Sequence, residues 1–456
     1  MTPDILSLGM FAAAFGILLL GYPVAFSLAG TALTFALLGS VFDWFDLQLL
    51  GILPERLFGI MSNETLIAIP LFIMMGVLLE RSKISEDLLT AMSQLFGTLK
   101  GGLGISVCIV GAILAASTGI VGATVVTMGL ISLPTMLKNK YSPKLATGII
   151  TASGTLGQII PPSIILVILG DIISSAHQEA QLSLGNFSPG AISVGDLFFG
   201  AVIPGLILVA CYILYVGFYS HLNPQSAPVM KTDVTKMGHF TLLKSLCPPL
   251  LLMIGVLGSI FLGVATPSEA ASVGCIGALL LTGLKKKLTV SILKDVTTTT
   301  TRINCMVFTI LIGASIFSLV FRGFGGDELV HHLLINLPGG SSSAFFIVMA
   351  IIFFMGFFLD FFEITFVVVP IVGPILLTMG FDPVWLGIMI ALNLQTSFLT
   401  PPFGFALFYL RGVAPPQVST MDIYKGVIPF IIIQITVMAL IWFIPEIVTW
   451  LPRLMY

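Results

Sequence analysis

Long apolar runs fill most of this chain, and short polar segments separate them. A helix needs about 20 mostly apolar residues to cross a membrane. By this measure the pattern predicts ten crossings, at 5–21, 24–40, 64–80, 143–171, 195–221, 245–262, 266–284, 302–322, 384–413 and 424–450. A pair of prolines interrupts two of these crossings, 143–171 and 384–413. The pattern therefore predicts an all-α polytopic membrane protein in which two of the helices are broken.

Two further apolar segments, 103–137 and 341–379, have polar or small residues near their middle. Each arm is then about 16–19 residues long, at the short end for a crossing. We predict that each segment enters the membrane and returns as a re-entrant hairpin. The alternative is two complete crossings joined by a tight loop. Both arrangements return the chain to the same side, so charge does not separate them.

Three shorter segments, about 51–62, 86–100 and 288–299, are amphipathic rather than fully apolar. Such helices lie in the membrane interface. They are either arms that clamp a moving part of the protein to a fixed part, or plain connectors.

The two proline pairs belong to an internal repeat. A shift of 240 residues carries Pro161-Pro162, in similar surroundings, onto Pro401-Pro402, and it also carries Pro134 onto Pro374. A chain that repeats itself and breaks a helix at the same place in each copy resembles the plan of a secondary transporter.

The composition is that of a membrane protein, and the distribution of Lys and Arg predicts its orientation in the membrane. The chain is 57% hydrophobic and 9% charged, whereas soluble proteins carry about 25% charged residues. If the polar loop between the halves is cytoplasmic, only Arg56, Arg322 and Arg453 of the 19 Lys and Arg residues fall outside. This asymmetry satisfies the positive-inside rule. Both termini are then expected on the outer, periplasmic side.

This orientation makes the two halves run through the membrane in opposite directions. Residues 1–222 form the first predicted repeat, with the hairpin at about 103–137 and the broken helix at 143–171. Residues 223–244 form a cytoplasmic connector, and 245–456 form the second repeat, with the hairpin at about 341–379 and the broken helix at 384–413. The predicted fold is thus two inverted-topology repeats, each with five crossings, a re-entrant hairpin and a Pro-broken helix.

The helix breaks predict cation sites. Proline has no N–H, so the carbonyls of Gly157 and Gln158, and of the equivalent pair before Pro401, lose their helical partners. In lipid such carbonyls must be satisfied by protein, water or an ion, and hard cations prefer oxygen ligands. We predict two Na⁺ sites, each joining one hairpin tip to one break. The predicted ligands are Gly119, Gly122, Ser153, Gly157, Gln158, Gly356, Asp360, Gln395, Thr396, Ser397 and Thr400. The alternative for each polar residue is an interhelical hydrogen bond.

Half-helices that begin after each proline pair point partial positive charge inward, which suits an anionic substrate. The predicted substrate contacts are Ser117, Thr118, Ser163, Asn393 and Phe403. The chain has no Walker A pattern, so we expect no ATP hydrolysis and no enzyme activity. Its net charge of −2 gives no indication of nucleic-acid binding.

Asp360 and Glu363 stand out in the second hairpin, because a carboxylate inside the membrane is a candidate functional group. The alternative is that both acids simply cap the returning helix. Asp360 falls at the turn, whereas Glu363 falls in the first turn of the next helix, where the helix dipole favours an acid.

Four motifs resemble a known family. Gly154–Ser163, Leu399–Gly404, Ala265–Ala270 and Gly21–Phe26 are similar to segments of the large membrane subunit of TRAP (tripartite ATP-independent periplasmic) transporters. The resemblance covers nearly the whole chain. One departure is the first hairpin tip, which is less rich in serine than that of many members.

The resemblance implies an importer of organic acids in the bacterial inner membrane, driven by two or more Na⁺ ions. It also implies an elevator-type mechanism, a small four-helix membrane subunit and a periplasmic solute-binding protein as partners. Leu359–Ile364 resembles a branch associated with 2-oxo acids and related monocarboxylates.

Two other functions are compatible with the sequence. One is a stand-alone ion-coupled carboxylate carrier of similar design that needs no binding protein. The other is a membrane scaffold without transport. Paired helix breaks with polar tips argue against the scaffold, which gains nothing from unsatisfied backbone groups.

Overall fold

A computed structural model describes residues 3–82, 84–229 and 239–455, and this part of the chain contains helices and turns but no strand. The predicted all-α fold is confirmed. The chain divides into two compact units. The first consists of Met1–Leu66, Ile168–Ser193 and Arg302–Leu386, and the second of Ile67–Val167, Val194–Thr301 and Gly387–Tyr456.

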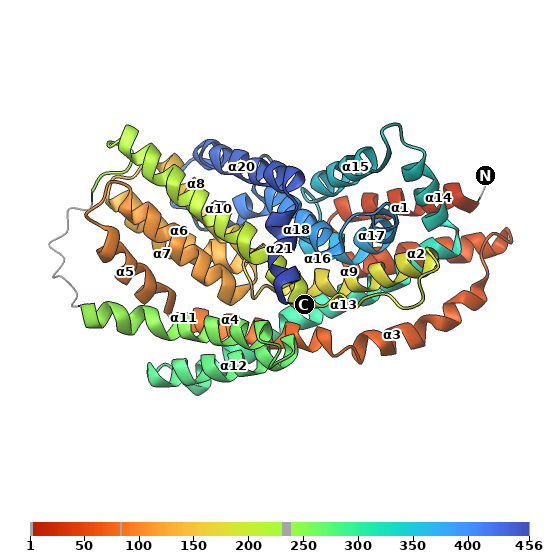
Figure 1. Cartoon of the computed structure of the whole chain (residues 1–456), viewed down its shortest axis with the longest axis horizontal. Coiled ribbons are helices and arrows are strands. Elements are labelled where there is room, and N and C mark those ends of the chain that lie inside the picture. Colours follow the sequence, from red (N-terminus) through yellow and green to blue (C-terminus); the bar gives the residue numbers. More distant parts are fainter. Residues whose placement is uncertain (1–2, 83, 230–238, 456) are drawn as a thin grey trace. The chain divides into compact units, whose positions relative to one another are not determined.

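The first unit contains the N-terminal helices and the helices in and just before the second predicted hairpin. Its complete elements are α1 (Pro3–Leu19), α2 (Val24–Val41), the 3-10 helix η1 (Leu47–Ile52), α3 (Leu53–Met61), α14 (Gly326–Ile335), α15 (Gly340–Met355), α16 (Phe361–Val367) and α17 (Val369–Thr378). Helix α1 contacts α2 and α14, and α14 contacts α15 and α17 (Figure 1). Buried aromatic side chains such as Phe317, Phe321 and Phe345 fill this unit.

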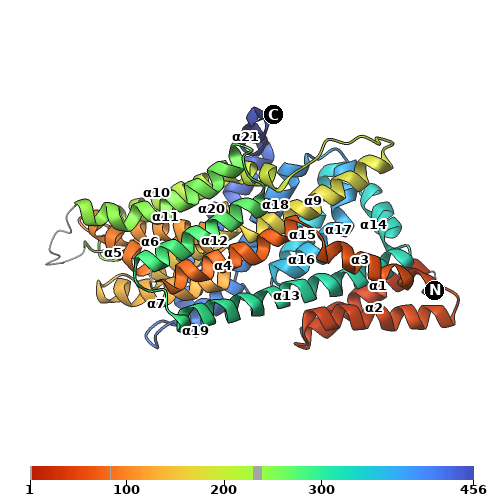
Figure 2. The ribbon, with the colours of Figure 1, turned by 90° about the horizontal axis from the view of Figure 1, so that it is seen from below.

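The second unit contains the first hairpin and most of the long apolar helices. Its complete elements are α4 (Ala68–Arg81), α5 (Ile84–Phe96), α6 (Gly102–Thr118), α7 (Val121–Lys138), α8 (Pro143–Thr155), η3 (Leu156–Gln158), α10 (Val194–Leu222), α11 (His239–Phe261), α12 (Pro267–Leu284), α19 (Phe405–Val413), α20 (Thr420–Phe443) and α21 (Glu446–Met455). Helix α12 packs along both α4 and α11, and the three lie side by side in both views (Figures 1 and 2).

Four elements occur where the chain passes between the units. They are the 3-10 helix η2 (Thr65–Ile67), α9 (Ile164–Ser183), α13 (Val290–Gly323) and α18 (Pro383–Leu399).

Six helices of the described part are long and apolar enough to cross a membrane, or up to eight spans if each bent helix pair counts as one. Shorter apolar stretches occur in α1, α11 and α18, and each corresponds to one of the ten predicted crossings. The chain is thus a multi-pass membrane protein. The number of complete crossings, and the side on which each terminus lies, stay predictions.

Two of the predicted amphipathic segments form separate helices, as η1 with α3 and as α5. The third prediction was wrong, because residues 288–299 are not a separate helix. They continue into the next apolar segment as α13, a single helix of 34 residues. Neither proline nor glycine interrupts the chain between Val290 and Ile312, so nothing there ends the helix.

The predicted crossing 424–450 is also too long. Helix α20 ends at Phe443 and α21 begins at Glu446. Pro445 lies between them, and a proline disfavours helical geometry in the residue before it.

The 240-residue shift matches helix boundaries as well as sequence. Helix α7 begins at Val121 and α16 at Phe361, and α8 begins at Pro143 and α18 at Pro383. The related prolines, Pro134 in α7 and Pro374 in α17, both lie inside helices. Helices therefore begin at equivalent positions in the two segments, although the helix equivalent to α7 is divided into α16 and α17. Their opposite orientation in the membrane stays a prediction.

Helices α8 and α20 approach each other closely. A Cβ atom added to Gly148 would lie 2.1 Å from the carbonyl oxygen of Gly426, and one added to Gly426 would lie 2.1 Å from that of Lys144. Small residues allow this kind of backbone contact between membrane helices. The contact holds α8, the helix that leads into the first break, against α20.

Candidate functional site

The first helix break lies between η3, which ends at Gln158, and α9, which begins at Ile164. The hydroxyl of Ser163 donates to the carbonyl of Gly157 at 2.8 Å and to that of Gln158 at 3.3 Å. The protein itself therefore satisfies part of the hydrogen-bonding capacity of the two carbonyls that the prolines leave without helical partners. Ser163 was predicted to bind substrate, but in this structure its buried hydroxyl points back into the break.

The tip of the first hairpin packs directly against this break. Gly119 ends α6 with φ +61, and a Cβ atom there would lie 3.1 Å from the backbone nitrogen of Ile164. A Cβ atom on Gly157 would lie 3.2 Å from the carbonyl oxygen of Ala115. A side chain at either glycine would require the neighbouring atoms to shift by a few tenths of an ångström. The structure thus brings together the two parts of the first predicted cation site.

Other members of that predicted site have different surroundings. The hydroxyl of Ser153 is buried and donates to the carbonyl of Ile149 at 2.6 Å. Gly122 faces the ring of Tyr409, which a Cβ atom would meet at 2.9 Å. The side chains of Ser117 and Thr118 lie outside the described residues, so their predicted substrate contacts are not placed.

Two glutamines beside the breaks carry unsatisfied polar atoms. Gln158 and Gln395 are fully buried. Within the described part of the chain, neither amide atom of Gln158 has a hydrogen-bond partner, and neither does the amide oxygen of Gln395. Leaving such a group unpaired costs about 1–3 kcal/mol. An ion or a polar ligand would relieve that cost, because the amide oxygen is a suitable ligand for a hard cation.

The breaks also contact each other. The amide nitrogen of Gln395 donates to the hydroxyl of Thr155 at 3.4 Å, across a sequence separation of 240 residues. That separation is the shift of the repeat, so the hydrogen bond joins equivalent positions of the two copies. Gln395 was predicted to be a cation ligand, with an interhelical hydrogen bond as the alternative. Its amide nitrogen makes such a bond. Thr155 was missed, although the shift applied to Gln395 leads to it.

The second break separates α18, which ends at Leu399, from α19, which begins at Phe405. The carbonyl of Ser397 accepts from the N–H of Thr400 at 3.0 Å. The hydroxyls of Thr396 and Thr400 donate to carbonyls one turn earlier, at 2.8 and 2.7 Å. Because both hydroxyl protons are donated to these carbonyls, the hydroxyl oxygens of Thr396 and Thr400 can only accept from, or ligate, another group.

The remaining predicted residues of the second break differ in exposure. Asn393 and Ser397 are buried, with relative exposures of 3% and 0%, whereas Phe403 is 44% exposed. Both proline pairs, Pro161-Pro162 and Pro401-Pro402, are joined by cis peptide bonds.

Asp360 and Glu363 form a reciprocal cap on α16. The Asp360 carboxylate accepts from the N–H of Phe361 at 2.7 Å, and the Glu363 carboxylate accepts from the N–H of Asp360 at 3.0 Å. The capping role that the sequence left as an alternative is thus present. Asp360 and Gly356 belong to the first unit and Gln395 to the second, so a second cation site between them stays a prediction.

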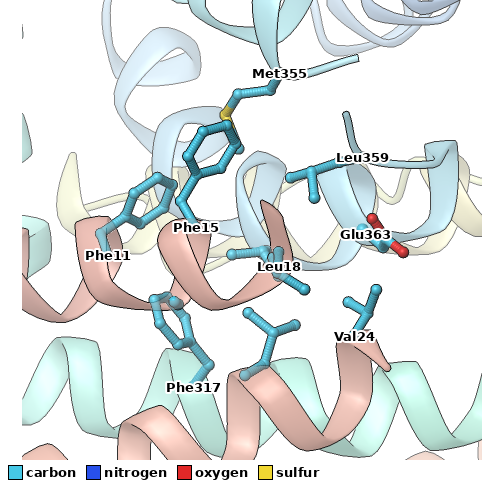
Figure 3. Close-up of a pocket in the computed structure, with 11 residues that line it drawn as sticks. Phe11, Phe15, Leu18, Val24, Phe317, Met355, Leu359 and Glu363 are labelled. Carbon is cyan, nitrogen blue, oxygen red and sulfur yellow. The ribbon is translucent and has the colours of Figure 1, made fainter. Parts of the chain in front are cut away.

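Glu363 also lines a small cavity of about 20 Å³. The other residues around it, among them Phe11, Phe15 and Leu359, are apolar, and Glu363 lies at the edge of the group (Figure 3). A cavity of this volume has room for about one water molecule. It is too small for an organic acid.

Two polar side-chain pairs in the first unit were not predicted. Asn63 donates to both carboxylate oxygens of Asp171, at 3.0 and 3.2 Å. Arg322 donates to both oxygens of Glu179, at 2.8 and 2.9 Å. The signal for Asp171 was available, because it is a carboxylate in the otherwise apolar run 164–173.

Comparison with known proteins assigns the chain to a family. The family described as "Tripartite ATP-independent periplasmic transporter, DctM component" matches residues 11–447. The C4-dicarboxylate TRAP transporter large permease protein DctM of Vibrio cholerae is 27% identical, over 98% of this chain and 97% of its own length. The sialic acid TRAP transporter large permease protein SiaM of the same species is 28% identical, over 96% of each.

A solved structure shares the fold. The YdaH transporter of Alcanivorax borkumensis superposes with a TM-score of 0.63 at 11% sequence identity, over 89% of each chain. At this identity the likeness concerns the fold alone. The family match covers nearly the whole chain, including both breaks and both predicted hairpins. The chain therefore belongs to the DctM component family of tripartite ATP-independent periplasmic transporters.

Proposed function

We propose that this chain is the large permease subunit of a Na⁺-coupled, binding-protein-dependent importer of organic acids. The observation that carries the proposal is the pair of helix breaks with buried, unsatisfied amide groups at Gln158 and Gln395. Na⁺ is here a transported ion, held by backbone carbonyls, hydroxyls and amide oxygens at each break. Its release would follow from movement of the hairpin tip away from the break.

The organic-acid class is supported by two points. Half-helices that begin after the proline pairs direct N–H groups toward the breaks, and such helix ends attract anions. Relatives of the chain are named for C4-dicarboxylates and for sialic acid. A periplasmic solute-binding protein would deliver the acid, and a small four-helix membrane subunit would complete the transporter.

The proposed movement is an elevator, in which a domain with both hairpins slides against a fixed scaffold. The predicted inverted topology of the two repeats suits such a movement around a fixed site. Ion pairs support the assignment of paired residues to the same side of the membrane. Arg322 pairs with Glu179, and both fall on the predicted periplasmic side, whereas Arg81 pairs with Asp295, and both fall on the predicted cytoplasmic side.

Uptake into proteoliposomes tests the proposal. The chain would be reconstituted with its small membrane subunit, and radiolabelled organic acids would be supplied with and without candidate binding proteins. We expect uptake only with an inward Na⁺ gradient and a cognate binding protein. Full uptake in Na⁺-free buffer would overturn the ion coupling, and equal uptake without binding protein would favour a stand-alone carrier.

A matched pair of variants tests the site. Gln158→Met removes the amide from the first break and nearly preserves the side-chain volume. Gln434→Met is the control, because Gln434 is also fully buried with an unpaired amide oxygen, but it lies inside α20 and its amide nitrogen donates to Tyr212. We expect weaker Na⁺ activation of uptake for Gln158→Met alone. Equal effects of the two substitutions would remove the first break from the ion path.

A further inference from the structure

A cavity of about 360 Å³ opens in the first unit, and it includes neither helix break. Its volume falls in the range of about 300–1,000 Å³ that is usual for small-molecule sites. The polar residues that line it are Arg56, Asn63, Asp171, Ser175, Ser315 and Ser318.

Arg56 supplies an unpaired positive charge to this cavity. The guanidinium is half-buried, and none of the described carboxylates lies within ion-pair distance of it. Glu179 attracts it from a greater distance, but both oxygens of that carboxylate are bound by Arg322. Arg322 in turn repels Arg56. A partly buried cation without a direct partner favours an anion from outside.

Asp171 supplies a fixed acceptor. The amide nitrogen of Asn63 holds both carboxylate oxygens, and the amide oxygen of Asn63 accepts from the N–H of Thr65 at 2.9 Å. This bond to the backbone fixes which way the Asn63 amide faces. The Asp171 carboxylate keeps further lone pairs, because its two oxygens together offer about four acceptor sites. They can accept a hydroxyl or an ammonium proton from a ligand.

We propose that this cavity is a binding site for a small carboxylic acid that also carries a hydrogen-bond donor, either a hydroxyl or an ammonium group. The carboxylate of the ligand binds the guanidinium of Arg56, and its donor binds the carboxylate of Asp171. The hydroxyls of Ser315 and Ser318 complete the polar lining. The lining of this cavity shares no residue with the predicted cation and substrate sites, so the proposal stands or falls independently of the function proposed above.

Calorimetric titration of the purified full-length chain in detergent tests the site. The probes are lactate, which carries a hydroxyl, alanine, which carries an ammonium group, and propionate, which carries neither donor. We expect lactate or alanine to bind roughly 10- to 150-fold more tightly than propionate, from the strength of hydrogen bonds to charged groups. The probe that binds more tightly identifies the donor. Binding of none of them, or equal binding of all three, would overturn the proposal.

Variants locate the binding in the cavity. Arg56→Gln should weaken it roughly 10- to 150-fold. Arg56→Lys should retain more, and Arg453→Gln is the control at an exposed arginine outside the cavity. Ser315→Phe fills the cavity without changing a charge, and it should abolish binding. It therefore tests the location even if Arg56→Gln fails to fold. Unchanged affinity in both Arg56→Gln and Ser315→Phe would refute this location.

Discussion

At the scale of single residues, Asp360 can serve two purposes with one carboxylate. It caps α16 through the N–H of Phe361, and it is the predicted Na⁺ ligand of the second hairpin tip. Asparagine is as good an N-cap as aspartate. The substitution Asp360→Asn therefore removes the charge and keeps the cap, so it separates the two roles.

We expect Asp360→Asn to fold normally and to need more Na⁺ for half-maximal uptake. Loss of one good ligand would cost about 1–3 kcal/mol, which corresponds to roughly 5- to 150-fold in affinity. Asp360→Ala removes the cap as well, and it should lower stability by about 1 kcal/mol. Uptake with an unchanged Na⁺ requirement in the asparagine variant would leave Asp360 as a cap only.

The sequence predicted the position of candidate ligands in the fold better than it predicted their contacts. Gln158, Gln395 and Asp360 were all predicted, and all lie at a break or a tip. The inward turn of the Ser163 hydroxyl was not predictable, because its partner carbonyls become available only through the shape of the break. The Asn63–Asp171 pair spans 108 residues, and no local pattern relates its members.

At the scale of helices, the contact of α8 with α20 depends on two glycines. A Cβ atom at Gly148 would lie 2.1 Å from a backbone oxygen of Gly426, so the backbones would have to separate. We expect Gly148→Ala to destabilise the protein by about 1–3 kcal/mol, as overpacking does. Thermal unfolding of the purified chain measures this change.

Gly217→Ala in α10 is the matched control, because a Cβ atom there meets nothing within 4 Å. Alanine is the better helix former, so this substitution should be neutral or stabilising. If both variants unfold at the same temperature, the α8–α20 contact does not limit stability.

Helix positions were more predictable than helix ends. Proline pairs and glycine turns mark the breaks, and the structure has them where the prolines fall. The end of α20 before Pro445 and the length of α13 were missed. Both errors came from using side-chain hydrophobicity to place helix ends. Hydrophobicity indicates which environment a segment faces, whereas a helix ends where the backbone can no longer keep helical geometry and hydrogen bonds.

At the scale of the whole molecule, the open prediction is orientation. In a variant without the five native cysteines, Gln178→Cys should react with an impermeant thiol reagent in intact cells. Gln225→Cys should react only after permeabilisation. Both positions are exposed, so a difference reports the side of the membrane rather than burial. The opposite labelling pattern would reverse the positive-inside assignment.

The hydrogen bond between Thr155 and Gln395 has a consequence for the history of the chain. It joins positions related by the 240-residue shift. In an assembly of two identical copies, such a position would have to pair with its own kind, so every mutation there would appear twice. Once both copies belong to one gene, each side can change alone. A threonine opposite a glutamine is a pairing that requires two copies free to change separately, as the two halves of one chain are.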